Sequence, residues 1–371
     1  MAYSWRGETG SELEFSTSEL TGALGDSVTV LPLLVALAAT TSVSLPHVLV
    51  GFGIFQIVWG LYYRMPMSLE PMKALVGLAI VGALTHGELA AAGLLAGGVL
   101  LVVGRFGLVS RLQQIVGEPV VRGVQFAVAL LLLEAAIDLS LANVPVAAGG
   151  VAIVLALAVV GYRQASVLLL LALGAVAAVL VAGIPSPQLP SPTPFASGTP
   201  TLTANALEGT IAQLGMTLGN AALATAILCG DLYDRRVSAD DLSKSMGATC
   251  LAAVPIGGIP MCHGSGGLAG KYAFGARTAG ANVLLGLGYL GLALVATGAL
   301  LAAFPLALLG VLLVVVAIEL GRAAFVRVSG RWALAIVVAV GAVGVLVNVG
   351  VAFVLGIAAW LVLERVGGTY G

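Results

Sequence analysis

Two segments of this chain, 194 residues apart, carry the same pattern, which indicates an internal duplication. Residues 19–26 read ELTGALGD and residues 213–220 read QLGMTLGN. The dipeptide at residues 66–67, Pro-Met, recurs at residues 260–261 with the same offset. Membrane proteins built from two copies of one unit are typically secondary transporters, with the site where the copies meet.

The composition indicates an integral membrane protein. Of the 371 residues, 60% are hydrophobic and 9% are charged, and the mean hydropathy is +1.10. A soluble domain carries roughly 25% charged residues. Continuous apolar stretches dominate over alternating ones, so we expect an all-α membrane protein in a lipid bilayer rather than an outer-membrane barrel. The 50 glycines fit close packing of helices in lipid.

Fourteen apolar segments are expected, seven in each copy. The first seven cover residues 27–44, 46–62, 69–85, 88–104, 118–138, 145–161 and 165–183. The second seven cover residues 203–230, 241–257, 263–276, 280–300, 303–321, 331–346 and 348–364.

The expected domain organisation follows from these segments. Residues 1–25 form a polar N-terminus, which is not a signal peptide, and the start of the first helix. The first repeat covers 26–183 and the second 203–366. Between them, residues 184–202 begin with a run of Pro and Ser that cannot continue a helix, and they form an extracellular linker.

Basic residues predict the orientation. If the N-terminus is cytoplasmic, the inner connections hold the following residues: Arg105, Arg111, Arg163, Arg235, Arg236, Lys244, Arg277, Arg322, Arg327, Arg331 and Arg365. The outer connections hold no Lys or Arg. This bias predicts a multi-pass protein of the plasma membrane with both termini in the cytoplasm. Because each copy has an odd number of segments, the repeats are inverted.

Two segments in equivalent positions are too short to span a membrane. The third, which follows Met65-Pro-Met-Ser-Leu-Glu-Pro-Met-Lys73, has about a dozen apolar residues, too few for a core of ~30 Å. The tenth, His263–Phe274, is short and rich in glycine. Such paired, interrupted segments are a strong sequence indication of a transporter site.

The chemistry of these segments predicts a site for a small anion. Each is expected to begin near the bilayer midplane after extended chain, and a helix start has free N–H groups and partial positive charge. We expect Gly264, Gly266 and Gly267 to allow close approach of the ligand. Ser68, Ser265 and His263 are expected to add donors.

A lysine in the first short segment needs a partner or a wet site. At mid-membrane, Lys73 would cost about 3 kcal/mol without one. It could either attract the anion or neutralise Glu70 on the same helical face. Leu69 lies between Ser68 and Glu70 and is included among the expected substrate contacts.

Other polar residues have more than one interpretation. Asp26 and Asn220 are equivalent, and we favour a shared role in holding the extended strands; with Gln213 they complete the expected substrate site. His263 could instead cap its helix, and Lys271 could reach the inner surface. Further polar residues are interpreted as structural: Glu134, Glu319 (paired with Arg322), and the free thiols Cys229, Cys250 and Cys262. We expect no metal, cofactor or nucleic-acid partner.

These motifs resemble the molybdate transporters of plants and prokaryotes, a family related to the sulfate permeases. The resemblance spans the chain and rests on the following motifs: Gly25-Asp26, Pro66-Met67, Pro71-Met72-Lys73, Gly219-Asn220-Ala221, Asp231-Leu232, Pro260-Met-Cys-His-Gly-Ser-Gly-Gly-Leu-Ala-Gly270 and Tyr272–Gly280. It implies seven-plus-seven inverted repeats, a core domain moving against a gate domain, and high-affinity uptake of molybdate.

Glu70 departs from the family pattern, which usually has Gln before Pro-Met-Lys. Three alternatives follow. Glu70 is paired with Lys73, or it is protonated during transport, or the substrate is not a dianion. Glu70 and Asp26 are therefore the candidates for proton coupling in a symport mechanism.

The sequence thus predicts a secondary importer of molybdate, with tungstate or sulfate as possible substrates and a proton as possible co-substrate. Segments 1–4 and 8–11 would form the core, and segments 5–7 and 12–14 the gate and the surface of a homodimer. The alternatives are a nucleobase or other small-anion permease of the same fold, or an anion channel. A serine-dependent enzyme is disfavoured because no acid accompanies His263 and Ser265 in the tenth segment.

Overall fold

The computed structural model describes residues 13–326 and 328–367, without the side chains of residues 220, 366 and 367. The first half contains α1 (Thr17–Thr40), α2 (Leu45–Tyr63), β1 (Glu70–Pro71), α3 (Lys73–Ile80), α4 (His86–Arg105), α5 (Val109–Val116), α6 (Glu118–Leu141), α7 (Val144–Val159) and α8 (Arg163–Ala182). The second half contains α9 (Ala204–Met216), the π-helix η1 (Thr217–Ala222), α10 (Leu223–Tyr233), α11 (Ala239–Ala253), β2 (Met261–Cys262), α12 (Ser265–Ala273), α13 (Gly280–Val295), α14 (Gly298–Ala303), α15 (Leu306–Phe325), α16 (Arg331–Leu346) and α17 (Val349–Gly367).

The all-α membrane fold is confirmed. Each expected segment coincides with a helix, and α9, η1 and α10 together form the eighth. Within the described ranges, seven helices are long and apolar enough to cross a membrane by length and composition. The short helices α5 and α14 are additional elements that the apolar pattern did not indicate.

The first helix begins ten residues before its apolar stretch. The side chain of Ser16 accepts a hydrogen bond from the N–H of Glu19 and so caps the helix. The buried Glu19 carboxylate in turn accepts from the backbone N–H groups of Arg277, Thr278 and Ala281. The polar start of α1 is thus held by the loop between α12 and α13.

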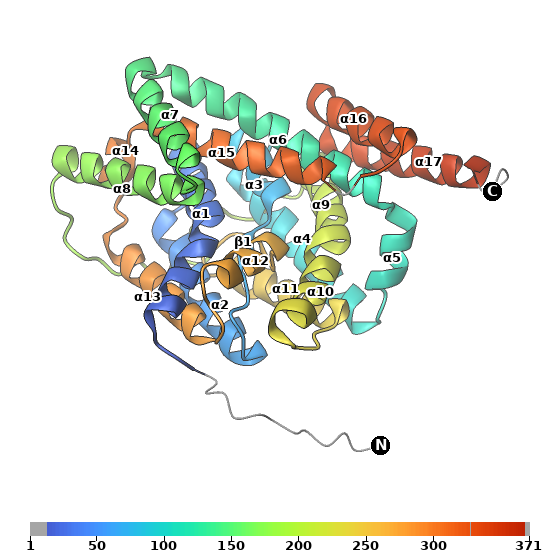
Figure 1. Ribbon diagram of the computed structural model, residues 1–371, viewed down its shortest axis with the longest axis horizontal. Helices are drawn as coiled ribbons and strands as arrows, with labels where there is room; N and C mark the ends of the chain where they lie inside the picture. The colour runs from blue at the N-terminus through green and yellow to red at the C-terminus, as the bar shows by residue number, and fades with distance from the viewer. Residues whose placement is uncertain (1–12, 327, 368–371) are drawn as a thin grey trace.

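The helices pack in two groups (Figure 1). In one group α2 packs on α13 and α4 on α11, while α1 contacts α12 and α3 contacts α9. When each helix is replaced by its equivalent in the other half of the chain, the α2–α13 pairing becomes α11–α4, and the α1–α12 pairing becomes α9–α3. This symmetry is expected for two related repeats. In the other group α6 packs on α15 and α16, and α7 packs on α8.

The two short helices follow extended chain, as expected. Strands β1 and β2 are antiparallel, with Glu70 opposite Cys262 and Pro71 opposite Met261. The N–H of Met72 extends this pairing by donating to the carbonyl of Pro260 over 3.0 Å. This crossing of the two repeats places the N-termini of α3 and α12 at the centre of the molecule.

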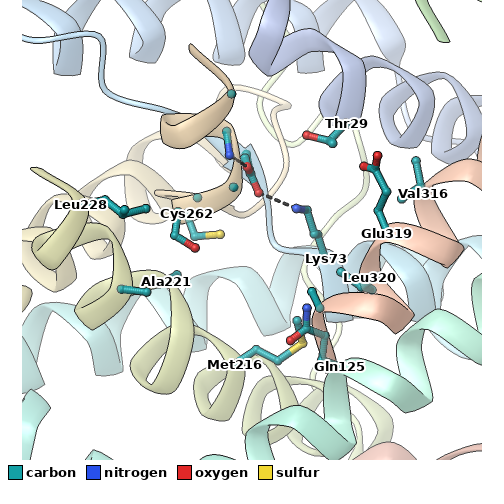
Figure 2. Close-up of a pocket in the computed structure, with 18 of the residues that line it drawn as sticks. Thr29, Lys73, Gln125, Met216, Ala221, Leu228, Cys262, Val316, Glu319 and Leu320 are labelled. Carbon is teal, nitrogen blue, oxygen red and sulfur yellow. Dashed lines mark hydrogen bonds and ion pairs between the residues drawn. The ribbon is translucent and has the colours of Figure 1, made fainter. Parts of the chain in front are cut away.

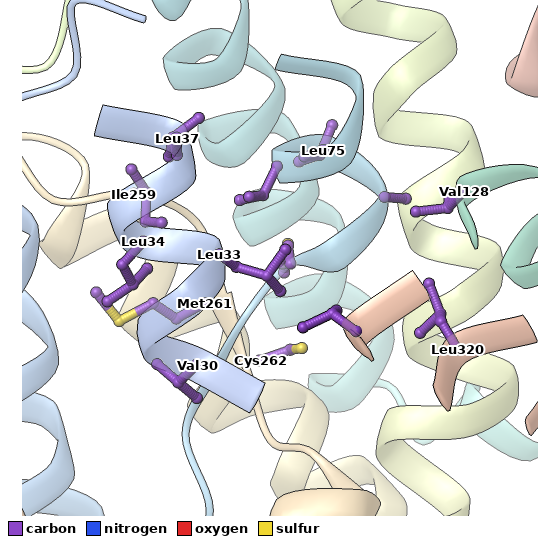
Figure 3. Close-up of a cluster of buried hydrophobic side chains, with 14 of the residues drawn as sticks. Val30, Leu33, Leu34, Leu37, Leu75, Val128, Ile259, Met261, Cys262 and Leu320 are labelled. Carbon is purple, nitrogen blue, oxygen red and sulfur yellow. The ribbon is translucent and has the colours of Figure 1, made fainter. Parts of the chain in front are cut away.

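Apolar packing surrounds this crossing. Leu33, Leu34 and Leu37 of α1 are buried and lie near Leu75 of α3 and Met261 of β2 (Figure 3). The α1 helix therefore packs against the crossing strands.

Glycines bring two helices of the core group into close contact. At the α4–α11 contact, a Cβ added to Gly97 would lie 2.8 Å from Cβ of Cys250 and 3.1 Å from the carbonyl oxygen of Gly247. Small residues at this contact allow the helix backbones to approach closely.

Candidate functional site

A cavity of about 510 Å³ lies between the two helix groups (Figure 2). Its core-side wall includes the following residues: Gly25, Val28, Thr29, Glu70, Lys73, Gln213, Met216, Ala221, Ala224, Ile227, Leu228, Asp231, Cys262, Gly264, Ser265, Gly266, Gly267 and Gly270. Its opposite wall includes Arg122, Gln125, Gln164, Val316, Glu319, Leu320, Ala323 and Val326. The cavity therefore meets the two short helices where they begin.

The N-terminus of α12 faces this cavity. Ser265 and Gly266 are its first two residues and line the wall, and N–H groups at these positions have no partner within a helix. The N–H of Gly267 donates to Oε1 of Glu70 over 2.8 Å. A Cβ on Gly267 would lie 2.1 Å from Oδ1 of Asp26 and 2.2 Å from Oγ of Ser68, so a larger residue here would displace these buried polar side chains.

Glu70 and Lys73 form an ion pair at the edge of the cavity. Nζ of Lys73 lies 2.6 Å from Oε2 of Glu70, and the two side chains are 19% and 4% exposed. Figure 2 shows the pair as a dashed line beside α12. The Glu70–Lys73 pairing considered from the sequence is thus present. The Glu70 carboxylate also accepts from an N–H group at the start of α12, so it occupies a donor that an anion in the cavity would use.

The N-terminus of α3 is already capped. Oε1 of Gln213 accepts from the N–H groups of Ala74 (2.9 Å) and Leu75 (3.4 Å), and its Nε2 donates to Thr217. An amide from α9 therefore takes two donors at the start of α3, just as Glu70 takes one at the start of α12, and the anion cradle formed by both helix starts stays a prediction.

Three predicted substrate contacts, Ser68, Leu69 and His263, are fully buried and lie outside the cavity wall. Ser68 donates to Oδ1 of Asp26 over 2.9 Å. The His263 ring lies 3.0 Å from the carbonyl oxygen of Ser68 and 2.8 Å from Oγ of Ser245. These side chains hold the extended segment in place, and their contact with substrate stays a prediction.

Asp26 is fully buried and lies outside the cavity wall, where it contacts the extended segment before β1. It accepts from Ser68 and, over 3.2 Å, from Nε2 of Gln56. Its sequence equivalent Asn220 falls in η1, and the side chain of Asn220 lies outside the described part of the chain.

Lys271 does not reach the inner surface. Its ammonium group is fully buried and lies 3.2 Å from Oδ2 of Asp26. The sequence signal for such a pair was a lysine within a short segment of few charges, but its partner is 245 positions away.

Two further charged residues line the cavity from the opposite wall. Arg122 of α6 donates to Glu118, Gln125 and the carbonyl of Ala323. Glu319 pairs with Arg163 over 3.6 Å, so the expected Glu319–Arg322 pair is corrected. Arg122 was not among the site residues predicted from the sequence, although it is a basic residue inside an apolar segment.

The fold and site define a multi-pass membrane transporter, in which interrupted helices meet at a cavity between two helix groups. A family model described as "Molybdate transporter of MFS superfamily" matches residues 18–132 and 205–320, one stretch in each half. The chain belongs to this family of molybdate transporters, so it is a transporter and not an enzyme. The resemblance seen in the sequence is confirmed.

Relatives and solved structures agree with this assignment. Molybdate transporter 2 of Arabidopsis thaliana is 30% identical over 368 residues, covering 83% of this chain and 78% of the relative. Molybdate transporter 1 of Chlamydomonas reinhardtii is 27% identical, covering 94% and 91%.

Among solved structures, the transmembrane domain of the cyanobacterial bicarbonate transporter BicA has a TM-score of 0.65 at 16% identity, covering 91% of this chain and 97% of that one. SLC26A9 has a TM-score of 0.69 at 12% identity, covering 94% and 65%. At these identities the likeness shows a shared fold.

Proposed function

We propose that the protein is a secondary transporter that imports molybdate, held at the N-terminus of α12 beside Lys73. The observation that carries the proposal is that free N–H groups, the Ser265 hydroxyl and the Lys73 ammonium meet at one cavity. A helix N-terminus attracts anions through its partial positive charge and its unpaired donors. The names of the curated relatives support molybdate as the substrate. Tungstate and sulfate, also tetrahedral dianions, are the expected competitors.

The mechanism we propose is alternating access by relative movement of the two helix groups. The cavity wall includes Gln164 at the start of α8, Asp231 near the end of α10 and Ala323 near the end of α15, and the distribution of basic residues assigns these helix ends to the cytoplasm. This arrangement corresponds to a state open to the cytoplasm, with both chain termini on that side of the plasma membrane. The domain boundaries and a homodimer formed through the gate group belong to the same proposal.

Glu70 is the proposed site of proton coupling. As a carboxylate it binds the Gly267 N–H and Lys73, the groups that an oxyanion would use. Protonation removes its charge and releases Lys73 toward the substrate. An inward proton gradient should therefore drive uptake in the wild type but not in Glu70→Gln. Uptake that is unchanged across pH in both proteins would reject the proton role.

Uptake of radioactive molybdate into liposomes containing the full chain tests the proposed function. Unlabelled tungstate should compete strongly, and uracil should not compete. Ser265→Ala and Lys73→Ala should each lower uptake by about tenfold or more, as loss of a charge-assisted contact predicts. Lys244→Ala is the matched control, because Lys244 is 41% exposed and lies outside the cavity. Uptake of uracil, or no uptake of any oxyanion, would contradict the proposal.

A further inference from the structure

A buried lysine lies behind the anion site in a cage of oxygen atoms. Nζ of Lys271 lies 2.8 Å from the carbonyl oxygen of Met67, 2.8 Å from Oδ1 of Asn282, 3.0 Å from Oε1 of Gln56 and 3.2 Å from Oδ2 of Asp26. These four oxygens come from α1, α2, the extended segment before β1, and α13. Lys271, Asp26, Gln56 and Asn282 are fully buried.

The cage has the chemistry of a monovalent metal-ion site. An ammonium has three N–H donors, whereas four oxygens from separate segments surround this one. Unwound backbone carbonyls coordinate coupling cations where transporter helices are interrupted, and carboxylate and amide oxygens are general ligands of hard cations. Here the ammonium group fills the centre of such a cage.

The cage also affects the anion site through Asp26. A Cβ on Gly267 of α12 would lie 2.1 Å from Oδ1 of Asp26, so this carboxylate lies directly behind the helix start that faces the cavity. Without a neighbouring cation, its negative charge would oppose an anion at α12. The other charged groups near it are the Glu70–Lys73 pair, which is itself balanced.

We propose that Lys271 is a tethered cation that takes the place of a dissolved coupling cation. It neutralises Asp26 and joins α12 to α1, α2 and α13, so molybdate transport needs no sodium or potassium ion. The part of this inference that concerns transport rests on the proposed function. Truncation to alanine would empty the cage and convert it into a binding site for a small monovalent cation.

Uptake by the full chain in liposomes tests the proposal, with sodium, potassium or N-methylglucamine as the cation. Wild-type uptake should differ by less than about twofold among the three salts, while Lys271→Ala should be about tenfold slower in N-methylglucamine. Sodium or propylammonium, which replaces the missing part of the side chain, should restore most of that loss. Lys271→Met is the matched control, because it fills the cage without a charge and should show no response to either cation.

Thermal unfolding provides a readout that does not depend on transport. Sodium and propylammonium should raise the Tm of Lys271→Ala and leave that of wild type and Lys271→Met unchanged. A sodium requirement in the wild type would overturn the inference, as would a Lys271→Ala protein that is insensitive to both cations or unfolded in every salt. Failure of the wild type to take up molybdate would reject the proposed function instead, and the unfolding arm would still test the cage.

Discussion

Replacing Glu70 by glutamine should tighten the binding of molybdate. Oε1 of Glu70 accepts from the Gly267 N–H, and Oε2 lies 2.6 Å from Nζ of Lys73. Glutamine keeps the size of the side chain and an oxygen for Gly267, but it has no charge to hold Lys73. The substitution therefore frees an ammonium group at the cavity and removes an anion from it.

The magnitude follows from the charges. At an effective dielectric constant of about 20, two unit charges about 5 Å apart interact by roughly 3 kcal/mol, and a dianion doubles that value. Solvent and salt in the cavity screen these charges. We therefore expect the free energy of molybdate binding to become more favourable by about 1.5–3 kcal/mol, which is about 10- to 100-fold in affinity.

Calorimetric titration of the purified wild type and Glu70→Gln with molybdate at neutral pH measures this effect. Glu134→Gln is the control, since it makes the same change at an exposed position of α6 outside the cavity. An affinity that is unchanged or weaker in Glu70→Gln at neutral pH would refute the idea that this carboxylate competes with the substrate.

Two further predictions concern packing and charge in the core group. Gly97→Ala should destabilise the protein by about 1–3 kcal/mol, because the added methyl group would overpack the α4–α11 contact. The control is the adjacent Gly98→Ala, whose methyl group would meet no atom within 4 Å and should be neutral or stabilising. Equal shifts in Tm for the two variants would contradict this prediction. Asp26→Asn should cost about 3–5 kcal/mol by removing the counter-charge of a buried ammonium. The neutral pair Asp26→Asn/Lys271→Met should recover most of that loss in urea unfolding, and additive losses would contradict the ion pair.

The fold was predictable because its determinants are local or periodic. Apolar stretches mark the membrane helices, and the repeated Pro-Met at residues 66 and 260 marks the extended segments that contain the two crossing strands. The start of α1 was less predictable. Glu19 looks like an exposed polar residue in the sequence, but it is buried by hydrogen bonds to backbone groups more than 250 positions away.

The site was predictable in part, because partners distant in sequence decide which groups are free. Ser265, Gly266 and Lys73 line the cavity as expected. No local signal indicated that Gln213 would cap α3, since the donors lie 138 and 139 positions away. The same holds for the Arg163–Glu319 pair, which joins two separate helices.

The most direct test of the account is the position of a bound oxyanion, located by the anomalous scattering of tungsten in crystals of the protein grown with tungstate. If molybdate binds at α12, the peak will lie in the cavity within hydrogen-bonding reach of the Ser265 and Gly266 N–H groups, with Lys73 turned toward it. A peak at the capped start of α3, or on the arginine side of the cavity away from α12, would contradict the assignment of the α12 N-terminus as the anion site.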